Sequence, residues 1–174
     1  MNALIRTQDK ETARGDVQKA YQIFEDRGVD MPDPLKLISA SPGYFSIMLS
    51  RNNYYSSHPN LGMSLLAHIR YFVSSRLEYG FCKRFNREML ARMGMTEDDF
   101  AAMGDDPGKS LLEDHDRLML TFVLDAMDDP EAVSAEDIDR LRQAGWTDGD
   151  MLDALAQGVG MIDHNIFMRV FKAA

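Results

Sequence analysis

The sequence has 174 residues, of which 45% are hydrophobic and 27% are charged, with one cysteine and a net charge of −9. This length and composition predict one soluble globular domain, because the chain can bury a single core and is not biased enough to stay disordered. The acidic balance argues against nucleic-acid binding, which needs a positive surface. No apolar stretch has the length of a signal peptide or a membrane span, so we expect a cytoplasmic protein that does not bind membranes. A single cysteine excludes an intramolecular disulfide and a cysteine-based zinc site.

The first predicted helix covers residues 11–27. Apolar side chains recur at helical spacing on one face of this segment, and Gly28 follows as a stop signal; the face consists of Val17, Ala20, Tyr21 and Phe24. We therefore divide the chain into an N-terminal segment with one helix, residues 1–30, and a helical domain, residues 31–174, within one structural domain overall.

Two prolines mark the next helix starts. Asp33 and Ser41 each precede a proline, which is the favoured pairing of an N-cap residue with the first helical position. This pattern predicts a short helical turn after Asp33 and a longer helix from Pro42 towards Tyr54.

The clearest helical period lies in residues 61–93. Its apolar positions are Leu61, Leu65, Leu66, Ile69, Phe72, Val73 and Leu77, continued by Phe81, Cys82, Phe85, Met89, Leu90 and Met93. Spacings of three and four residues predict one buried stripe on consecutive helices. Within it Cys82 and Asn86 share a face, and Tyr79 lies one turn earlier.

An internal repeat predicts two tight helical corners. Residues 90–100 and 141–151 share the pattern L-x-x-x-G-[MW]-T-x-x-D-[FM]. In each copy the glycine ends one helix, and the threonine caps the next helix together with the aspartate three residues later.

Helices are also expected between and after these corners. We predict a helix in residues 110–127, a further helix capped by Ser134, and one or two helices after residue 150 with a weak point at Gly158 and Gly160. The expected inward positions of the helix in residues 110–127 are Leu111, Leu112, His115, Leu118, Met119, Phe122 and Val123. No segment alternates like a strand, so the predicted fold class is all-α.

Cationic side chains crowd around Cys82, although residues 97–153 hold 18 acidic residues against four basic ones. The cations near the cysteine in sequence are Arg70, Arg76, Lys83, Arg84, Arg87 and Arg92. Two interpretations remain open. The cations pair with acidic neighbours or subunits, or they lower the pKa of the Cys82 thiol and favour its thiolate.

These motifs, in this order, resemble the alkylhydroperoxidase AhpD-like and carboxymuconolactone decarboxylase superfamily. The resemblance rests on the SPGYF helix start, the arginine-containing helix before Y-x-x-C, the two corner segments, and the HNIFMRVFKA ending, and it covers roughly residues 34–173. It implies an all-helical AhpD-like fold, a homo-oligomer, and an oxidoreductase or antioxidant ancestry.

The redox branch of that family resembles E-x11-C-x-x-C-x3-H, in which the glutamate and histidine relay protons and the second cysteine meets the peroxide. With Cys82 as the second cysteine, the glutamate position falls on Ala67, the first cysteine on Tyr79 and the histidine on Asn86. An intramolecular disulfide cycle is thus excluded. His68, next to the missing glutamate, is a candidate substitute in the relay.

The candidate site residues are therefore Cys82, His68, Tyr79 and Asn86, and we expect neither a cofactor nor a metal. A one-cysteine peroxidase is the first hypothesis, in which Cys82 reacts with a hydroperoxide and an external thiol reduces it. The alternatives are a non-redox decarboxylase-like enzyme, with Arg70 holding the carboxylate of a small acid or lactone, and a silent oligomeric binding protein with a buried core thiol.

Overall fold

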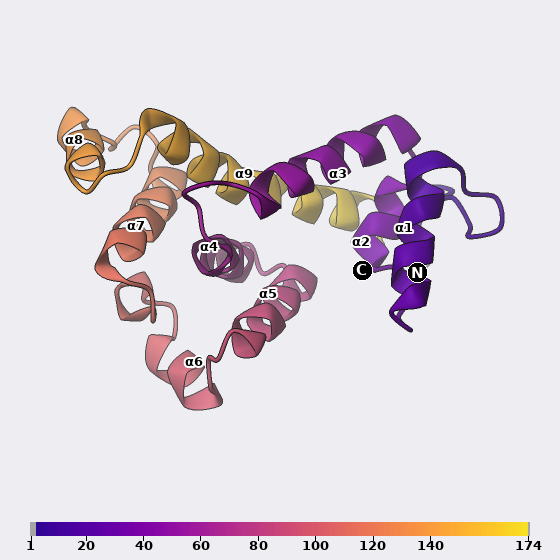
Figure 1. Ribbon diagram of the computed structural model, residues 1–174, viewed down its shortest axis with the longest axis horizontal. Coiled ribbons are helices and arrows are strands. Elements are labelled where there is room, and N and C mark those ends of the chain that lie inside the picture. The colour runs from indigo at the N-terminus through magenta and orange to yellow at the C-terminus, as the bar shows by residue number, and fades with distance from the viewer. Residues whose placement is uncertain (1–2, 174) are drawn as a thin grey trace. The chain divides into compact units, whose positions relative to one another are not determined.

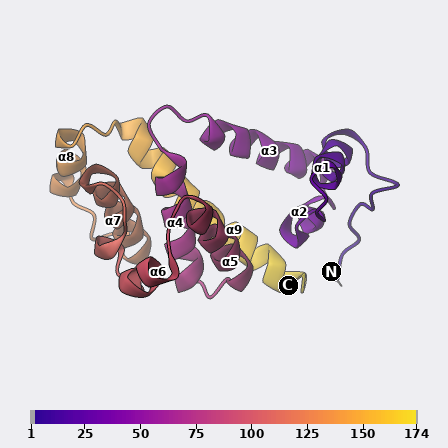
Figure 2. The same cartoon turned by 60° about the horizontal axis from the view of Figure 1, so that its bottom comes forward.

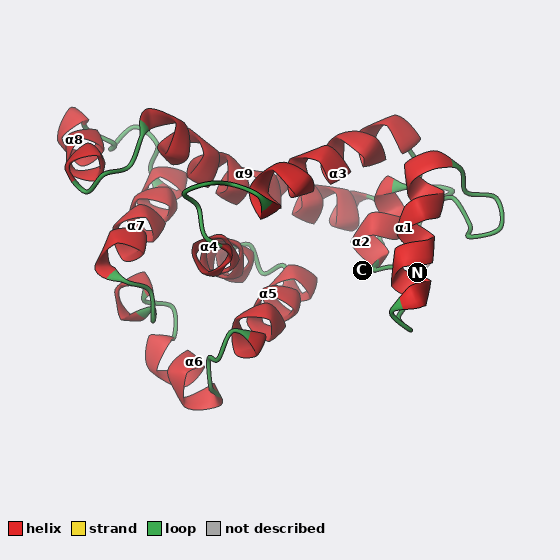
Figure 3. Cartoon of the chain, in the orientation of Figure 1, coloured by secondary structure: helices red, strands yellow, loops and turns green. Residues whose placement is uncertain are grey.

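The computed structural model describes residues 3–173, and this part of the chain contains nine α-helices, one short 3-10 helix and no strand (Figure 3). The all-α prediction is confirmed. The helices are α1 (Gly15–Asp26), α2 (Asp33–Ile38), α3 (Pro42–Ser56), α4 (Met63–Arg76), α5 (Gly80–Arg92), α6 (Glu97–Met103), η1 (Pro107–Lys109), α7 (Asp114–Asp128), α8 (Ala135–Gln143) and α9 (Asp148–Val170).

The helices gather into two compact units. The first contains the residues up to Ser57 together with those from His164 onward, and the second contains His58–Asp163. Helix α9 contributes residues to both. The division predicted near residue 30 falls inside the first unit, in the loop between α1 and α2.

The core of the first unit lies where α1 packs against α3. Its buried residues are Ala13, Val17, Ala20, Met31, Ile38, Phe45 and Met48. Tyr21 and Phe24 pack against this cluster, so the apolar face predicted for the first helix is confirmed. The helix ends at Asp26, and Gly28 adopts a positive φ of 68°, as a glycine stop signal should.

The two proline signals differ in their outcome. Ser41 occupies the N-cap of α3 and Pro42 is its first residue, as predicted. The N-cap role predicted for Asp33 is wrong, because α2 begins at Asp33 and Pro32 takes the N-cap position. Pro34 therefore stands second in the helix, where its missing N–H still costs no hydrogen bond within the helix.

Helix α4 is the central element of the second unit. It packs against α5 and α7, and Figures 1 and 2 both show it beside α5. Its buried residues are Leu65, Leu66, Ala67, His68, Ile69, Tyr71, Phe72, Val73 and Ser74. Because these positions surround the helix, neighbours cover α4 on nearly all sides.

The two predicted corners are confirmed. Gly94 and Gly145 have φ angles of 109° and 101°, which favour glycine. Thr96 forms a capping box with Asp99 at the start of α6. The equivalent hydrogen bonds connect Thr147 and Asp150 at the start of α9.

Two residues expected to point inward from α7 do not. Leu111 is 60% exposed, because α7 begins only at Asp114 and Leu111 precedes it. His115 is exposed in the first turn, where its ring stacks on Trp146 with centroids 3.9 Å apart. Met119 and Val123 are buried as predicted.

The weak point expected in the last helix is absent, since α9 continues through Gly158 and Gly160. A Cβ at Gly158 would lie 2.6 Å from the Met127 sulfur and 3.1 Å from a Val123 methyl carbon. Gly158 therefore allows close packing of α9 on α7 and does not interrupt the helix.

A sharp corner at Glu78 joins α4 to α5. Glu78 has a φ of 52°, a left-handed conformation that side chains other than glycine seldom adopt. Its N–H donates to the Ser75 carbonyl oxygen at 3.1 Å, and the N–H of Tyr79 donates to the Ser74 carbonyl oxygen at 2.9 Å. These bonds close the end of α4 and place Tyr79 at the N-cap of α5.

Replacing Glu78 with glycine should stabilise the protein. Glu78→Gly relieves the left-handed strain, so we expect the free energy of unfolding to rise by about 0.5–1 kcal/mol. The matched control is Glu88→Gly in the exposed interior of α5, which should lower it by about 1 kcal/mol. Urea unfolding of both variants measures these changes. Destabilisation by Glu78→Gly would show that the corner carries no strain.

Candidate functional site

Three of the four candidate residues lie on the inner face of α5 and at its N-cap. Tyr79, Cys82 and Asn86 are 5%, 8% and 1% exposed. Their spacing of three and four residues puts them on one side, and α5 packs this side against α4. The shared face predicted for Cys82 and Asn86 is therefore present.

Arg70 of α4 completes this group. Its Nε donates a hydrogen bond to Asn86 Oδ1 at 2.9 Å, and Asn86 Nδ2 donates to the Cys82 carbonyl oxygen at 2.8 Å. A guanidinium N–H also points to the Met89 sulfur at 3.5 Å. Asn86 thus connects the cation on α4 to the cysteine on α5 through its side-chain amide.

Burial decides the protonation state of Cys82. It raises the pKa of the thiol to about 11, although the Tyr79 hydroxyl and the Arg70 guanidinium both act to lower it. The hypothesis that the surrounding cations produce a low net pKa is therefore wrong. At neutral pH Cys82 is a neutral thiol that has one nearby cation.

Three of the other cations near Cys82 in sequence have partners elsewhere. Arg76 pairs with Asp128 at 2.5 Å, Arg87 pairs with Glu97, and Lys83 lies over an aromatic ring of α4. The interpretation that this basic region pairs with acidic neighbours is thus confirmed for Arg76 and Arg87. Arg70 also has no carboxylate partner among the described residues, and its Nε donates to Asn86 Oδ1 instead.

The Arg70 guanidinium keeps its charge at neutral pH despite its position. Loss of hydration lowers its pKa to about 10, and the adjacent Cys82 acts in the opposite direction. Its hydrogen-bond partners are a neutral amide and a thioether, neither of which compensates the charge. A half-buried cation of this kind is costly unless something pairs with it.

The Tyr79 hydroxyl is also incompletely satisfied. It is buried and has no well-formed hydrogen bond within the described part of the chain. Burial raises the pKa of Tyr79, and the neighbouring Cys82 raises it further. The two groups are thus close enough to influence each other but are not aligned for a good hydrogen bond. The hydroxyl stays protonated and is a donor that favours the Cys82 thiolate.

His68 lies away from this group. Residues two apart on a helix are about 200° apart around its axis, so His68 and Arg70 occupy opposite sides of α4. His68 Nδ1 donates to the Ser64 carbonyl oxygen at 2.8 Å, while Nε2 is buried without a partner among the described residues. Burial lowers its pKa. No hydrogen bond joins it to Cys82, so its role in a proton relay stays a prediction.

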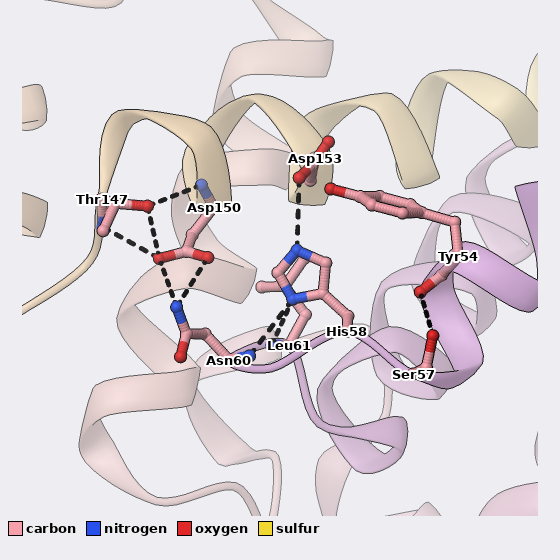
Figure 4. A network of polar contacts seen from close by, with 8 residues as sticks. All are labelled: Tyr54, Ser57, His58, Asn60, Leu61, Thr147, Asp150 and Asp153. Atoms are coloured by element: carbon pink, nitrogen blue, oxygen red, sulfur yellow. Dashed lines mark hydrogen bonds and ion pairs between the residues drawn. The ribbon is translucent and has the colours of Figure 1, made fainter.

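A histidine that the sequence pattern did not single out forms a second polar network (Figure 4). His58 Nε2 contacts Asp153 Oδ2 at 3.2 Å, and His58 Nδ1 accepts the backbone N–H groups of Asn60 and Leu61. Asn60 in turn donates to both carboxylate oxygens of Asp150 at 3.1 Å.

We interpret this network as a clamp between the loop before α4 and the start of α9. Both ring nitrogens of His58 are engaged, which favours a structural role over proton transfer. Local spacing could not reveal it, because 95 residues separate His58 from Asp153.

Residues 3–173 also bear on metal binding and on membrane insertion. No group of three histidine, cysteine or acidic side chains is placed to hold a metal ion, and no helix combines the length and apolarity needed to cross a membrane. Two pockets lie away from Cys82, one between α7 and α8 and the other beside α1.

No protein-family model and no curated protein sequence matches the chain. Among solved structures, it is similar to an alkylhydroperoxidase AhpD core, an uncharacterized peroxidase-related protein from Ralstonia eutropha JMP134. The TM-score is 0.81 at 17% identity, covering 100% of this chain and 92% of the other.

A second similar structure is an uncharacterized peroxidase-related protein from Silicibacter sp. TM1040. Its TM-score is 0.76 at 18% identity, covering 90% of this chain and 83% of the other. At such identities the likeness establishes the fold. The chain therefore has the AhpD-like helical fold that its motifs predict.

The pH dependence of alkylation should reveal the raised pKa of Cys82. A shift from 9.0 to about 11 leaves about a hundredfold less thiolate at pH 7 than in an unperturbed cysteine. We expect the rate with iodoacetamide to keep rising above pH 9, whereas the urea-unfolded protein levels off near that pH. Mass spectrometry of the single cysteine measures both rates. A plateau below pH 8 in the folded protein would contradict this assignment.

Proposed function

We propose that the protein is a one-cysteine, thiol-dependent peroxidase in which Cys82 reduces a hydroperoxide. The observation that carries this proposal is the position of the Cys82 sulfur beside two groups that favour its thiolate, Tyr79 and Arg70. The peroxidase-related proteins with the same fold give further support.

The proposed reaction proceeds through a sulfenic acid. The Cys82 thiol loses its proton to solvent, and the thiolate attacks the terminal oxygen of the hydroperoxide. The sulfur–oxygen bond forms as the oxygen–oxygen bond breaks, and the leaving alkoxide takes a proton from solvent to become an alcohol. An external thiol then attacks the sulfenic acid sulfur, which releases water and forms a mixed disulfide with Cys82. A second external thiol cleaves this disulfide, restoring the Cys82 thiol and leaving the two external thiols joined as a disulfide. The reductant is external because the position of a resolving cysteine holds Tyr79.

This chemistry should be slow at neutral pH. The pKa of about 11 means that the reactive thiolate is a small fraction of the protein, and no histidine or carboxylate hydrogen-bonds the thiol to remove its proton. Asn86, at the position of the family's histidine, holds Arg70 in place and does not act as a base. We therefore propose a rate that rises with pH.

A second candidate function follows from Arg70. A half-buried cation without a carboxylate partner fits a non-redox enzyme that acts on a small carboxylate or lactone. Such an enzyme would retain activity in Cys82→Ser, whereas the proposed peroxidase would lose it. This difference separates the two candidates.

We also propose that the protein forms a homo-oligomer. Phe85 on α5 and Met93 at its C-cap are each 46% exposed, although the apolar period predicts that they are buried. Contact with another subunit would cover them. The stack of Phe85 on Phe81, with centroids 6.4 Å apart, holds the first of these side chains in place.

Peroxide treatment followed by trapping of sulfenic acid tests the peroxidase. We expect a dimedone adduct at Cys82 after incubation with cumene hydroperoxide, with more adduct at pH 9 than at pH 7 because the thiolate fraction rises. Cys82→Ser should form no adduct and consume no peroxide in the presence of dithiothreitol.

Arg84→Met serves as the control for a lost positive charge, because Arg84 is exposed on the same helix and should react like the parent protein. Absence of an adduct at both pH values in the parent protein would end the peroxidase proposal.

A further inference from the structure

The polar groups around Cys82 share one unusual property: their unused hydrogen-bonding capacity consists of donors. Arg70 uses one N–H on Asn86 Oδ1 and directs another at the Met89 sulfur, so its remaining N–H groups have no partner among the described residues. The buried Tyr79 hydroxyl is likewise unpartnered there. Cys82 adds the weak donor of a neutral thiol.

The acceptors that would normally satisfy these donors are already engaged or absent. Asn86 Oδ1 accepts from Arg70, and the Cys82 carbonyl oxygen accepts from Asn86. The nearest acidic residues in sequence, Glu78 and Glu88, are exposed, and neither bonds to Arg70. Buried polar groups in folded proteins are almost always satisfied, so the buried Tyr79 hydroxyl beside the partly exposed Arg70 cation points to a ligand that accepts hydrogen bonds.

From this arrangement we infer that Arg70 and Tyr79 form a binding site for the carboxylate of a small monoanion beside the Cys82 sulfur. The flat fork of a guanidinium matches the two oxygens of a carboxylate, and the Tyr79 hydroxyl supplies a further donor. A single cation favours a monoanion, because a phosphate dianion would retain uncompensated charge in this buried place.

Solvent reaches this group of residues at Arg70. Arg70 is half-buried, so part of the side chain reaches the surface, while Tyr79 and Cys82 are covered. Asn86 is a positioning residue, since it orients the guanidinium without contacting the anion.

This inference rests on the proposed function in one respect: it names the substrate class of the same site, a hydroperoxide that carries a carboxylate. Anion binding itself is independent of peroxide chemistry. The two statements can therefore fail separately.

The single cysteine provides a direct test with two alkylating reagents. Iodoacetate carries the carboxylate and iodoacetamide is its neutral counterpart; in both, the thiolate forms a bond to carbon as iodide leaves. We expect the ratio of the two rates, iodoacetate over iodoacetamide, to exceed the ratio for the urea-unfolded protein by about tenfold, the effect of a charge-assisted hydrogen bond.

Arg70→Met should return this ratio to that of the unfolded protein, and Arg84→Met should leave it close to that of the parent. Because both reagents consume the same thiolate, a change in the pKa of Cys82 cancels from the ratio. An unchanged ratio in Arg70→Met would overturn the inference.

A second measurement covers the case in which buried Cys82 reacts with neither reagent. In Cys82→Ser, sodium acetate should raise the melting temperature relative to sodium chloride at equal concentration, because a ligand that binds the folded state stabilises it. Adding Arg70→Met should abolish this rise, and circular dichroism before heating verifies that the double variant is folded. No difference between acetate and chloride in Cys82→Ser would overturn the inference.

These readouts separate the anion site from the peroxidase. A preference for iodoacetate without a sulfenic acid adduct supports the anion site and contradicts the peroxidase. An adduct without the preference supports the peroxidase and contradicts the anion site.

Discussion

The hydrogen bond from Arg70 to Asn86 is the interaction on which the candidate site depends. It holds the Arg70 guanidinium of α4 against the inner face of α5. Asn86 is itself fixed, because its side-chain amide donates a hydrogen bond to the Cys82 carbonyl oxygen. Removing water from a cation is costly, and a neutral amide offsets only part of that cost. The charge of Arg70 is thus only partly compensated where α4 meets α5. A charge of this kind is more typical of functional sites than of ordinary cores.

The same two helices show why the thiol is not activated by charge alone. Coulombic attraction from Arg70 favours the thiolate, but α4 and α5 also exclude water from the sulfur, and the loss of hydration has the larger effect. No histidine or carboxylate among the described residues hydrogen-bonds the thiol to remove its proton. The hydrophobic environment and the missing base therefore both disfavour formation of the Cys82 thiolate.

Local patterns in the sequence are sufficient to predict most of the helices and both corners. Capping pairs such as Thr96 with Asp99, and glycine at 94 and 145, specify the corners through hydrogen bonds a few residues apart. The failures have local causes as well. Leu111 was assigned to a helix that starts three residues later, and Phe85 followed the apolar period although it lies at the margin of the face that α4 covers.

The site was less accessible to sequence reasoning. Spacing placed Tyr79, Cys82 and Asn86 together, but the partner of Asn86 depends on how α4 rotates against α5, and this rotation favours Arg70 over the neighbouring His68. The net pKa of Cys82 depends on depth of burial, which no spacing encodes. The clamp between His58 and Asp153 depends on contacts across 95 residues and had no local pattern.

The stacking of Trp146 on His115 has a practical consequence for spectroscopy. Trp146 is the single tryptophan of the chain, and it lies at the corner between α8 and α9 in the second unit. Its indole nitrogen donates to the His115 carbonyl oxygen at 3.2 Å, so its emission follows the local integrity of that corner. The helices of the first unit contain no such fluorophore. Comparing tryptophan emission with far-ultraviolet circular dichroism would therefore reveal whether the two units melt together or in sequence.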